Sequence, residues 1–189
     1  MATTAPERTP VFNIPNQLTA ARLVLAFVLF GLIEYHQWIW AFVIFVVAAF
    51  TDWLDGYLAR RLNLGSTLGR NLDPLVDKVL ICGAYIFLIP VDDSGLKAWM
   101  AVVVVARELI ITSLRGYLES LGAVFGADML GKVKMVAQCA ALIAVLVVLQ
   151  WPGHEPLKWT RDLFIYAMLA STSLSGIQYL YRAFAMLRQ

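Results

Sequence analysis

The chain has 189 residues, of which 60% are hydrophobic, with a mean hydropathy of +0.72 and a formal net charge of +2. These values exclude an ordinary soluble domain and indicate a helical protein that crosses a membrane several times. The small net charge does not suggest a nucleic-acid partner. Both cysteines, Cys82 and Cys139, lie inside apolar segments, so we interpret them as packing residues and not as disulfide or metal-binding residues.

Six apolar segments follow one another along the chain, each close to the ~20 residues that a bilayer crossing requires. The polar stretch at residues 1–10 contains two prolines and is predicted to be a flexible N-terminus. Residues 11–189 are predicted to form a single domain, in which a short segment from Phe12 to Leu18 lies partly in the membrane interface. We therefore expect an all-α integral membrane protein with six transmembrane helices, at about residues 17–35, 38–60, 70–91, 96–119, 130–151 and 160–186.

Basic residues are distributed unevenly between the two predicted sides of the membrane. One side receives only Lys97, Lys158 and Arg161. The other side, which holds both termini and the second and fourth connections, receives Arg8, Arg22, Arg60, Arg61, Arg70, Arg115, Lys132, Lys134, Arg182 and Arg188. The positive-inside tendency places this second side in the cytoplasm, in what we expect to be the cytoplasmic membrane of a bacterium. Five tryptophans near the opposite ends are typical of an aromatic belt: Trp38, Trp40, Trp99, Trp151 and Trp159.

Four aspartates surround the connection between the second and third predicted spans. Asp52 and Asp55 are three residues apart, and Asp73 and Asp77 are four residues apart, so each pair shares one helix face. If the two faces oppose each other, four carboxylates surround one point, and two divalent ions would balance their four negative charges. Oxygen ligands suit a hard ion such as Mg²⁺ or Mn²⁺. The sequence thus predicts a two-metal centre at a membrane surface.

Small residues recur at the same helical spacing as the aspartates. Gly56 and Ala59 follow Asp52 and Asp55 by four residues, and Gly69 precedes Asp73 by four. They leave room either for a flat ligand or for close helix packing. An isolated aspartate in a membrane could also serve a proton path or an ion pair, and a basic residue there could be an interfacial anchor. Four aspartates in two helical pairs, with small residues beside them, favour the metal site.

The whole run from Asp52 to Asp77 resembles the complete signature of the CDP-alcohol phosphotransferase family. The resemblance implies six transmembrane helices, a homodimer and an active site open to the cytoplasm. It implies that Asp52, Asp55 and Asp73 bind two divalent metal ions, and that Asp77 is a general base that can also contact a metal. It further implies that the CDP group of a substrate lies against Gly56, Ala59, Arg60, Ser66, Thr67 and Gly69.

Three other blocks, which begin at Asn13, Ala106 and Gly131, resemble the branch of this family whose acceptor is sn-glycerol 3-phosphate. The residues after Trp151 add little to the resemblance. In that branch, CDP-diacylglycerol donates its phosphatidyl group to the acceptor and CMP leaves. A phosphate dianion needs basic partners, and we expect them to be Arg107, Arg115, Lys132 and Lys134.

Several alternatives stay open on the sequence alone. A buried arginine such as Arg107 could instead pair with a protein carboxylate, for example that of Glu108. Lys132 and Lys134 are two residues apart, so they cannot both face one cavity squarely, and either could be a membrane anchor. The acceptor could be inositol phosphate or phosphatidylglycerol. From other classes, a divalent-cation carrier leaves Arg60 unexplained, and a purely structural membrane subunit does not explain the clustered carboxylates.

Overall fold

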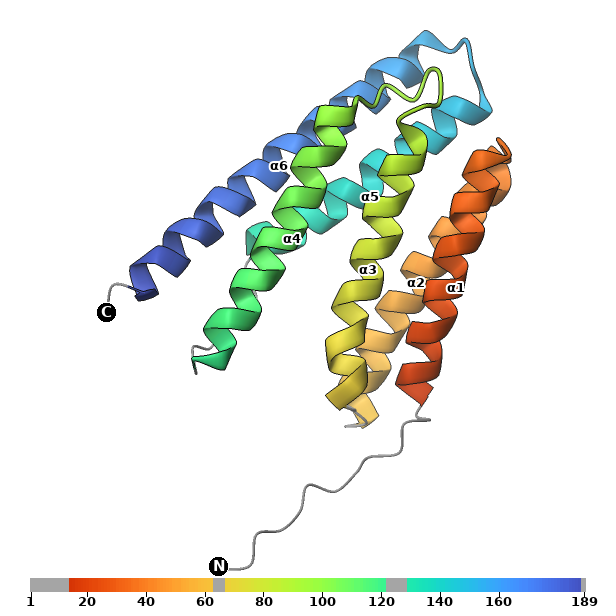
Figure 1. Cartoon of the computed structure of the whole chain (residues 1–189). Helices are drawn as coiled ribbons and strands as arrows, with labels where there is room; N and C mark the ends of the chain where they lie inside the picture. Colours follow the sequence, from red (N-terminus) through yellow and green to blue (C-terminus); the bar gives the residue numbers. More distant parts are fainter. Residues whose placement is uncertain (1–13, 63–66, 122–128, 188–189) are drawn as a thin grey trace, which may run out of the picture.

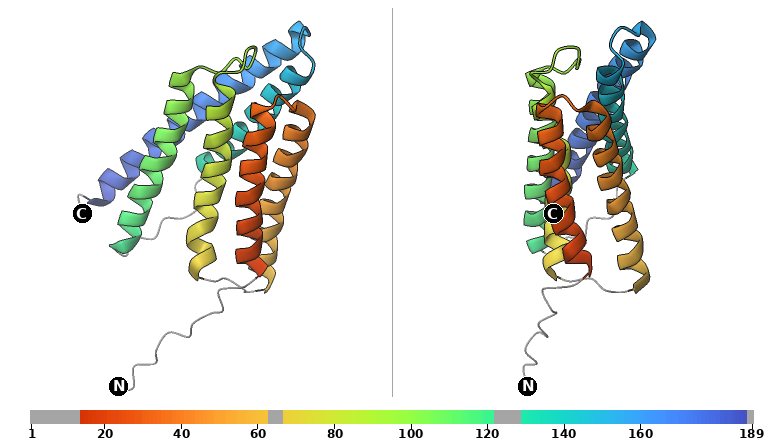
Figure 2. Two further views of the ribbon diagram at one scale, coloured as in Figure 1. Left: turned by 45° about the vertical axis from the view of Figure 1, so that its right-hand side comes forward. Right: turned by 90° about the vertical axis from the view of Figure 1, so that its right-hand side faces the viewer.

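The computed structural model describes the backbone of residues 14–62, 67–121 and 129–187, and the side chains of residues 17–51, 75–121 and 129–186. The described residues form six α-helices and no strand. The helices are α1 (Ile14–Glu34), α2 (Trp38–Leu62), α3 (Thr67–Leu88), α4 (Ala98–Ser120), α5 (Met129–Gln150) and α6 (Glu155–Leu187). They alternate up and down in an elongated bundle (Figures 1 and 2).

The predicted all-α fold with six helices is confirmed, and most predicted helix ends lie within three residues of the observed ones. The first helix begins at Ile14, so the part of the predicted interfacial segment from Ile14 to Leu18 belongs to α1. Residues 1–13 lie outside the described part of the chain. The sixth helix begins at Glu155 instead of residue 160, with Pro156 in its first turn, where the missing N–H of proline costs no helical hydrogen bond.

Three stretches within the described helices are long and apolar enough to cross a membrane: Gln17–Glu34, Met129–Gln150 and Glu155–Met186. α2 contributes a shorter apolar stretch, Trp38–Thr51. α3 and α4 carry ionisable residues in their middle, which lowers their hydropathy. Length and composition therefore indicate a membrane protein with at least three spanning helices.

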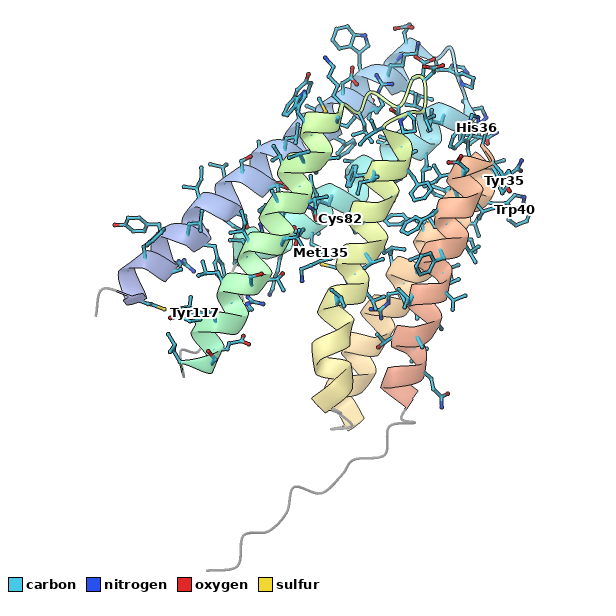
Figure 3. The ribbon with its side chains drawn as sticks, in the orientation of Figure 1. Tyr35, His36, Trp40, Cys82, Tyr117 and Met135 are labelled. Carbon is cyan, nitrogen blue, oxygen red and sulfur yellow. The ribbon has the colours of Figure 1, made fainter. Side chains whose placement is uncertain are left out.

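The arrangement of the helices leaves α5 in a central position. α1 packs against α2 and α3, α6 packs against α4 and α5, and α5 also contacts α2 and α3. Because the helices alternate in direction, α1, α3 and α5 begin at one end of the bundle and α2, α4 and α6 finish there; in Figure 1 this end lies at the bottom for α1 to α4 and higher up at the left for α5 and α6. We call this the lower end and the opposite one the upper end. At the upper end Trp40 projects outward (Figure 3), and the other four tryptophans of the predicted aromatic belt lie at or near helix ends on that side; the belt itself stays a prediction.

One apolar core runs through the bundle. Five of its alanines have no exposed surface, which lets neighbouring helices approach closely: Ala26, Ala41, Ala48, Ala84 and Ala141. The core also contains the buried phenol of Tyr85 on α3, which donates a 2.8 Å hydrogen bond to the backbone carbonyl of Gln138 on α5. α3 and α5 are thereby tied together next to the polar region described below.

A close contact between α1 and α3 depends on Gly83. The ring of Phe30 lies over this glycine, and a Cβ added there would stand 2.1 Å from the ring carbon Cζ. Phe30 is also stacked on Phe87 with ring centroids 5.0 Å apart, so the ring has little room to move aside. The position therefore requires a residue without a side chain.

We expect Gly83→Ala to lower the free energy of unfolding by about 1–3 kcal/mol, because the core becomes overpacked. Gly31→Ala is the matched control, since a Cβ at that helical glycine meets nothing within 4 Å and alanine favours the helix. Denaturant titration in detergent, followed by circular dichroism, measures both. Equal midpoints for Gly83→Ala and the unmodified protein would contradict the packing argument.

Candidate active site

The four signature aspartates lie on two helices that meet the lower end of the bundle. Asp52 and Asp55 are in the last turns of α2, and Asp73 and Asp77 are in the second and third turns of α3. Both helices are continuous through these positions, so the spacing of three and four residues places each pair on one helix face. Asp77 is the one of the four whose side chain is described.

The residues expected to contact CDP lie in the same region. Gly56, Ala59 and Arg60 are on α2, Thr67 and Gly69 open α3, and Ser66 lies outside the described residues. The side chains of 52–74 are likewise outside the described part, so their roles stay predictions. Among the described side chains there is no group of three or more that could hold a metal ion. The chemistry of the predicted donor set, four carboxylates on two helix faces, fits hard divalent cations.

Asp77 forms an ion pair inside the bundle. Nη1 of Arg22 on α1 donates a 2.8 Å hydrogen bond to Oδ1 of Asp77 on α3. The Arg22 side chain is 1% exposed and that of Asp77 is 31% exposed, so the arginine approaches from the protein side and the carboxylate keeps an accessible surface. Because a buried guanidinium needs an anionic partner, this pair fixes the carboxylate relative to α1.

The partnership of Arg22 with Asp77 was not predicted from the sequence, where Arg22 counted as a topological charge and as the last residue of the block that begins at Asn13. The available signal was the position of the residue, well inside an apolar helix instead of at its edge. A basic residue at such a depth requires a counter-charge. The sequence alone could not say which of several carboxylates supplies it.

A second set of ionised residues lies where α4, α5 and α6 meet. Glu108 on α4 is 5% exposed and accepts a 2.6 Å hydrogen bond from Nζ of Lys134 on α5. Nη1 of Arg107 lies 3.3 Å from both carboxylate oxygens of Glu108. Arg107 therefore does have a protein carboxylate as partner, the alternative that the sequence left open. We call Arg107, Arg115 and Lys134, together with Glu108, the basic cluster.

α6 holds the two arginines of the basic cluster. Ser175 Oγ accepts a 2.6 Å hydrogen bond from Nη2 of Arg107, and Tyr179 Oη accepts a 3.2 Å bond from Nε of Arg115. The Arg115 guanidinium also lies over the Tyr179 ring, 5.8 Å from its centroid. A Cβ at Gly176 would stand 3.2 Å from Cγ of Arg107. The region after Trp151, which adds little to the family resemblance, thus contributes three residues to the site.

The two predicted lysines of α5 have different environments. Lys134 is 7% exposed and bonded to Glu108, whereas Lys132 is exposed on the helix surface. The sequence predicted that only one of them could face a given cavity squarely, and Lys134 is the one that joins the basic cluster. Lys132 lies on a different side of α5.

Lys78 on α3 is a further basic residue at the site, and it was not predicted from the sequence. It is half-buried and interacts electrostatically with its neighbour Asp77, with Glu108 and with Arg115. Its charge therefore lies within electrostatic reach of both Asp77 and the basic cluster. The signal in the sequence was its adjacency to Asp77, but the proximity to α4 depends on packing between helices.

The comparisons with known proteins agree with this geometry. Residues 12–176 match the CDP-alcohol phosphatidyltransferase family, and the chain belongs to that family. The match covers α2 and α3, with all four aspartates, and the whole of α4 and α5 with the basic cluster residues that they carry.

Curated relatives indicate which branch of the family the chain resembles. The chain is 35% identical over 191 residues to the CDP-diacylglycerol–glycerol-3-phosphate 3-phosphatidyltransferase of Bacillus subtilis, an alignment that covers 89% of this chain and 94% of the relative. Proteins with the same name in Yersinia pestis and Salmonella typhimurium are also 35% identical, over 92% and 89% of this chain and 96% and 93% of their own lengths. The resemblance to the glycerol 3-phosphate branch is thus seen over nearly the whole chain.

We expect Arg22 and Asp77 to behave as one energetic unit. Arg22→Met should destabilise the protein because it removes the cation that contacts the partly buried carboxylate at 2.8 Å, and Asp77→Asn should destabilise it because it removes the negative charge from the same contact. The double variant should lose less free energy of unfolding than the two single variants together, with a coupling energy of about 0.5–3 kcal/mol. Denaturant titrations of all four proteins in detergent measure this cycle, and strictly additive effects would show that the pair carries no interaction energy.

Proposed function

We propose that this protein transfers the phosphatidyl group of CDP-diacylglycerol to sn-glycerol 3-phosphate, which yields phosphatidylglycerophosphate and CMP. Family membership supports the reaction type, and the names of the relatives support the donor and the acceptor. The observation that carries the choice of acceptor is the basic cluster. Its three cations, with one carboxylate among them, leave an excess of positive charge for a phosphate group.

The acceptor phosphate is proposed to contact Arg107, Arg115 and Lys134, with Lys78 at the side nearest to α3 and Lys132 as an outer contact. Ser175 and Tyr179 support this role, because they fix the two guanidinium groups from α6. Lys78 interacts electrostatically with Asp77 as well as with Glu108 and Arg115, which supports a phosphate position close to the aspartates. The hydroxyl of the acceptor would then point toward the aspartates.

Asp77 is proposed as the general base that takes the proton of the attacking hydroxyl. A general base acts only when it lies within hydrogen-bond reach of the proton that it takes. The carboxylate of Asp77 supports this role, because it is accessible and Arg22 holds it in place. Asp52, Asp55, Asp73 and Asp77 would hold two Mg²⁺ or Mn²⁺ ions, which when bound supply positive charge to the diphosphate and to the departing CMP. The CDP group would lie against Gly56, Ala59, Arg60, Ser66, Thr67 and Gly69.

The bundle is proposed to lie in the cytoplasmic membrane of a bacterium. All six helices of one domain, residues 11–189, would cross it, with both termini and the lower end in the cytoplasm. The distribution of basic residues supports this orientation. The lipid tails of the donor would stay in the hydrocarbon region while its diphosphate reaches the aspartates at the interface. A homodimer is the expected assembly.

The decisive assay is CMP release by the purified protein in detergent with CDP-diacylglycerol and Mg²⁺. We expect release that depends on glycerol 3-phosphate and stops when a chelator is added. Release that requires inositol phosphate or phosphatidylglycerol instead would keep the family chemistry and overturn the acceptor. If folded protein releases no CMP with any alcohol but carries divalent cations across sealed vesicles, the transferase proposal is wrong.

The two lysines of α5 offer a matched pair for the acceptor site. Lys134→Met should raise the KM for glycerol 3-phosphate about 10–100-fold, which corresponds to the loss of one charge-assisted hydrogen bond. Lys132→Met should raise it much less, because that side chain lies on the exposed surface of α5. The KM for CDP-diacylglycerol should stay within about twofold in both variants. The reverse order of effects would place the acceptor on the other side of α5.

A further inference from the structure

The buried carboxylate of Glu108 has a role that the reaction itself does not require. It is 5% exposed, and no step of the proposed transfer uses it as an acid, a base or a metal ligand. A carboxylate beside a phosphate dianion would repel it if the two touched. The position of Glu108 within the acceptor site therefore needs another explanation.

Hydrogen bonds from three side chains converge on this carboxylate. Oε1 accepts hydrogen bonds from Nζ of Lys134 at 2.6 Å and from Nε2 of Gln138 at 3.4 Å, both on α5. Nη1 of Arg107, the preceding residue on α4, lies 3.3 Å from Oε1 and from Oε2. One carboxylate thus organises donors from two helices, and through Arg107 it is linked to Ser175 on α6.

The shared oxygen limits how far apart the two cations can be. Nζ of Lys134 and Nη1 of Arg107 lie 2.6 and 3.3 Å from Oε1, so at most 5.9 Å separates them. Without the carboxylate, two positive charges in an apolar surrounding would repel each other and separate. At this spacing both groups can donate to different oxygens of one phosphate group. The cations are also slightly more exposed than the carboxylate, with side-chain exposures of 13% and 9% against 6%.

We propose that Glu108 is a positioning residue for the acceptor, which holds Arg107 and Lys134 side by side so that both donate to the phosphate of the incoming alcohol. The net charge of the three groups stays positive, so the site attracts an anion. Glu108 acts from behind the cations and does not touch the substrate. This inference rests on the proposed acceptor site, and it adds a residue whose effect is indirect.

The test is a comparison of Glu108→Gln with the unmodified protein in the CMP-release assay. The KM for glycerol 3-phosphate should rise about 10–100-fold, because glutamine cannot accept from both cations with full charge assistance. The KM for CDP-diacylglycerol should stay within about twofold. Glu119→Gln is the matched control, since Glu119 lies on the same helix and is exposed. An unchanged acceptor KM in Glu108→Gln would overturn the proposal.

The unfolding midpoint separates positioning from a purely structural role, in a variant that keeps Lys134 as a phosphate contact. If Glu108 only stabilised the bundle, sucrose at a concentration that restores the unfolding midpoint of Glu108→Gln would also restore the acceptor KM. We expect the midpoint to recover and the KM to stay raised. Recovery of both would reject the positioning role. If Glu108→Gln does not fold, Glu108→Asp replaces it as the test, because the shorter carboxylate keeps the charge but reaches only one cation. An acceptor KM in Glu108→Asp equal to that of the unmodified protein would again reject the positioning role.

The unmodified protein distinguishes this inference from the proposed function. If it fails to use glycerol 3-phosphate, the acceptor assignment is wrong whatever the variants do. If it uses glycerol 3-phosphate and Glu108→Gln binds it equally well, only the positioning role is wrong. Protection of the protein against thermal unfolding by glycerol 3-phosphate gives a second readout that needs no turnover, and Glu108→Gln should lose most of that protection.

Discussion

The arrangement of this bundle depends on how it compensates ionised groups that its apolar helices bury. An uncompensated charge in such an environment costs several kcal/mol, so each must have a partner close by. Lys134 meets Glu108 at 2.6 Å between α5 and α4, and Arg22 meets Asp77 at 2.8 Å between α1 and α3. The first pair joins two consecutive helices and the second joins α1 to α3, and both pairs fix where polar residues of the site lie along their helices.

The sequence predicted the helices well because apolar residues dominate all six segments, and apolar segments have few alternative structures in a membrane. It predicted the candidate site only in part. Spacing along one helix follows from the sequence, which is why the aspartate pairs on α2 and α3 could be recognised from the residue pattern alone. Contacts between helices do not follow from it. Ser175 and Tyr179 are 68 and 64 residues away from the arginines they hold, and nothing in the local pattern of α6 distinguishes them.

Because contacts between helices do not follow from the sequence, the burial of some basic residues was not predicted either. Counting charges assigned Arg22 and Lys134 to a membrane surface, yet both are buried and paired. A charge count treats every lysine and arginine alike, whereas burial separates those that anchor a helix from those that serve a site. Depth along the helix carried part of this information for Arg22. For Lys134, only packing against Glu108 distinguishes it from its exposed neighbour Lys132.

The charge asymmetry between the two ends of the bundle persists when the residues of the site are left out. The exposed Arg182, which is not part of the site, still lies toward the lower end. At the upper end, Lys158 pairs with Asp93 and Glu155, and Arg161 is 7% exposed and bonded to Asp162. Two of the three basic residues on that side are thus neutralised by adjacent carboxylates. Acidic partners cancel basic charges at both ends, because Asp77 and Glu108 likewise pair with Arg22 and Lys134. The asymmetry between the two ends therefore depends on exposed basic residues and not on the full count of lysines and arginines.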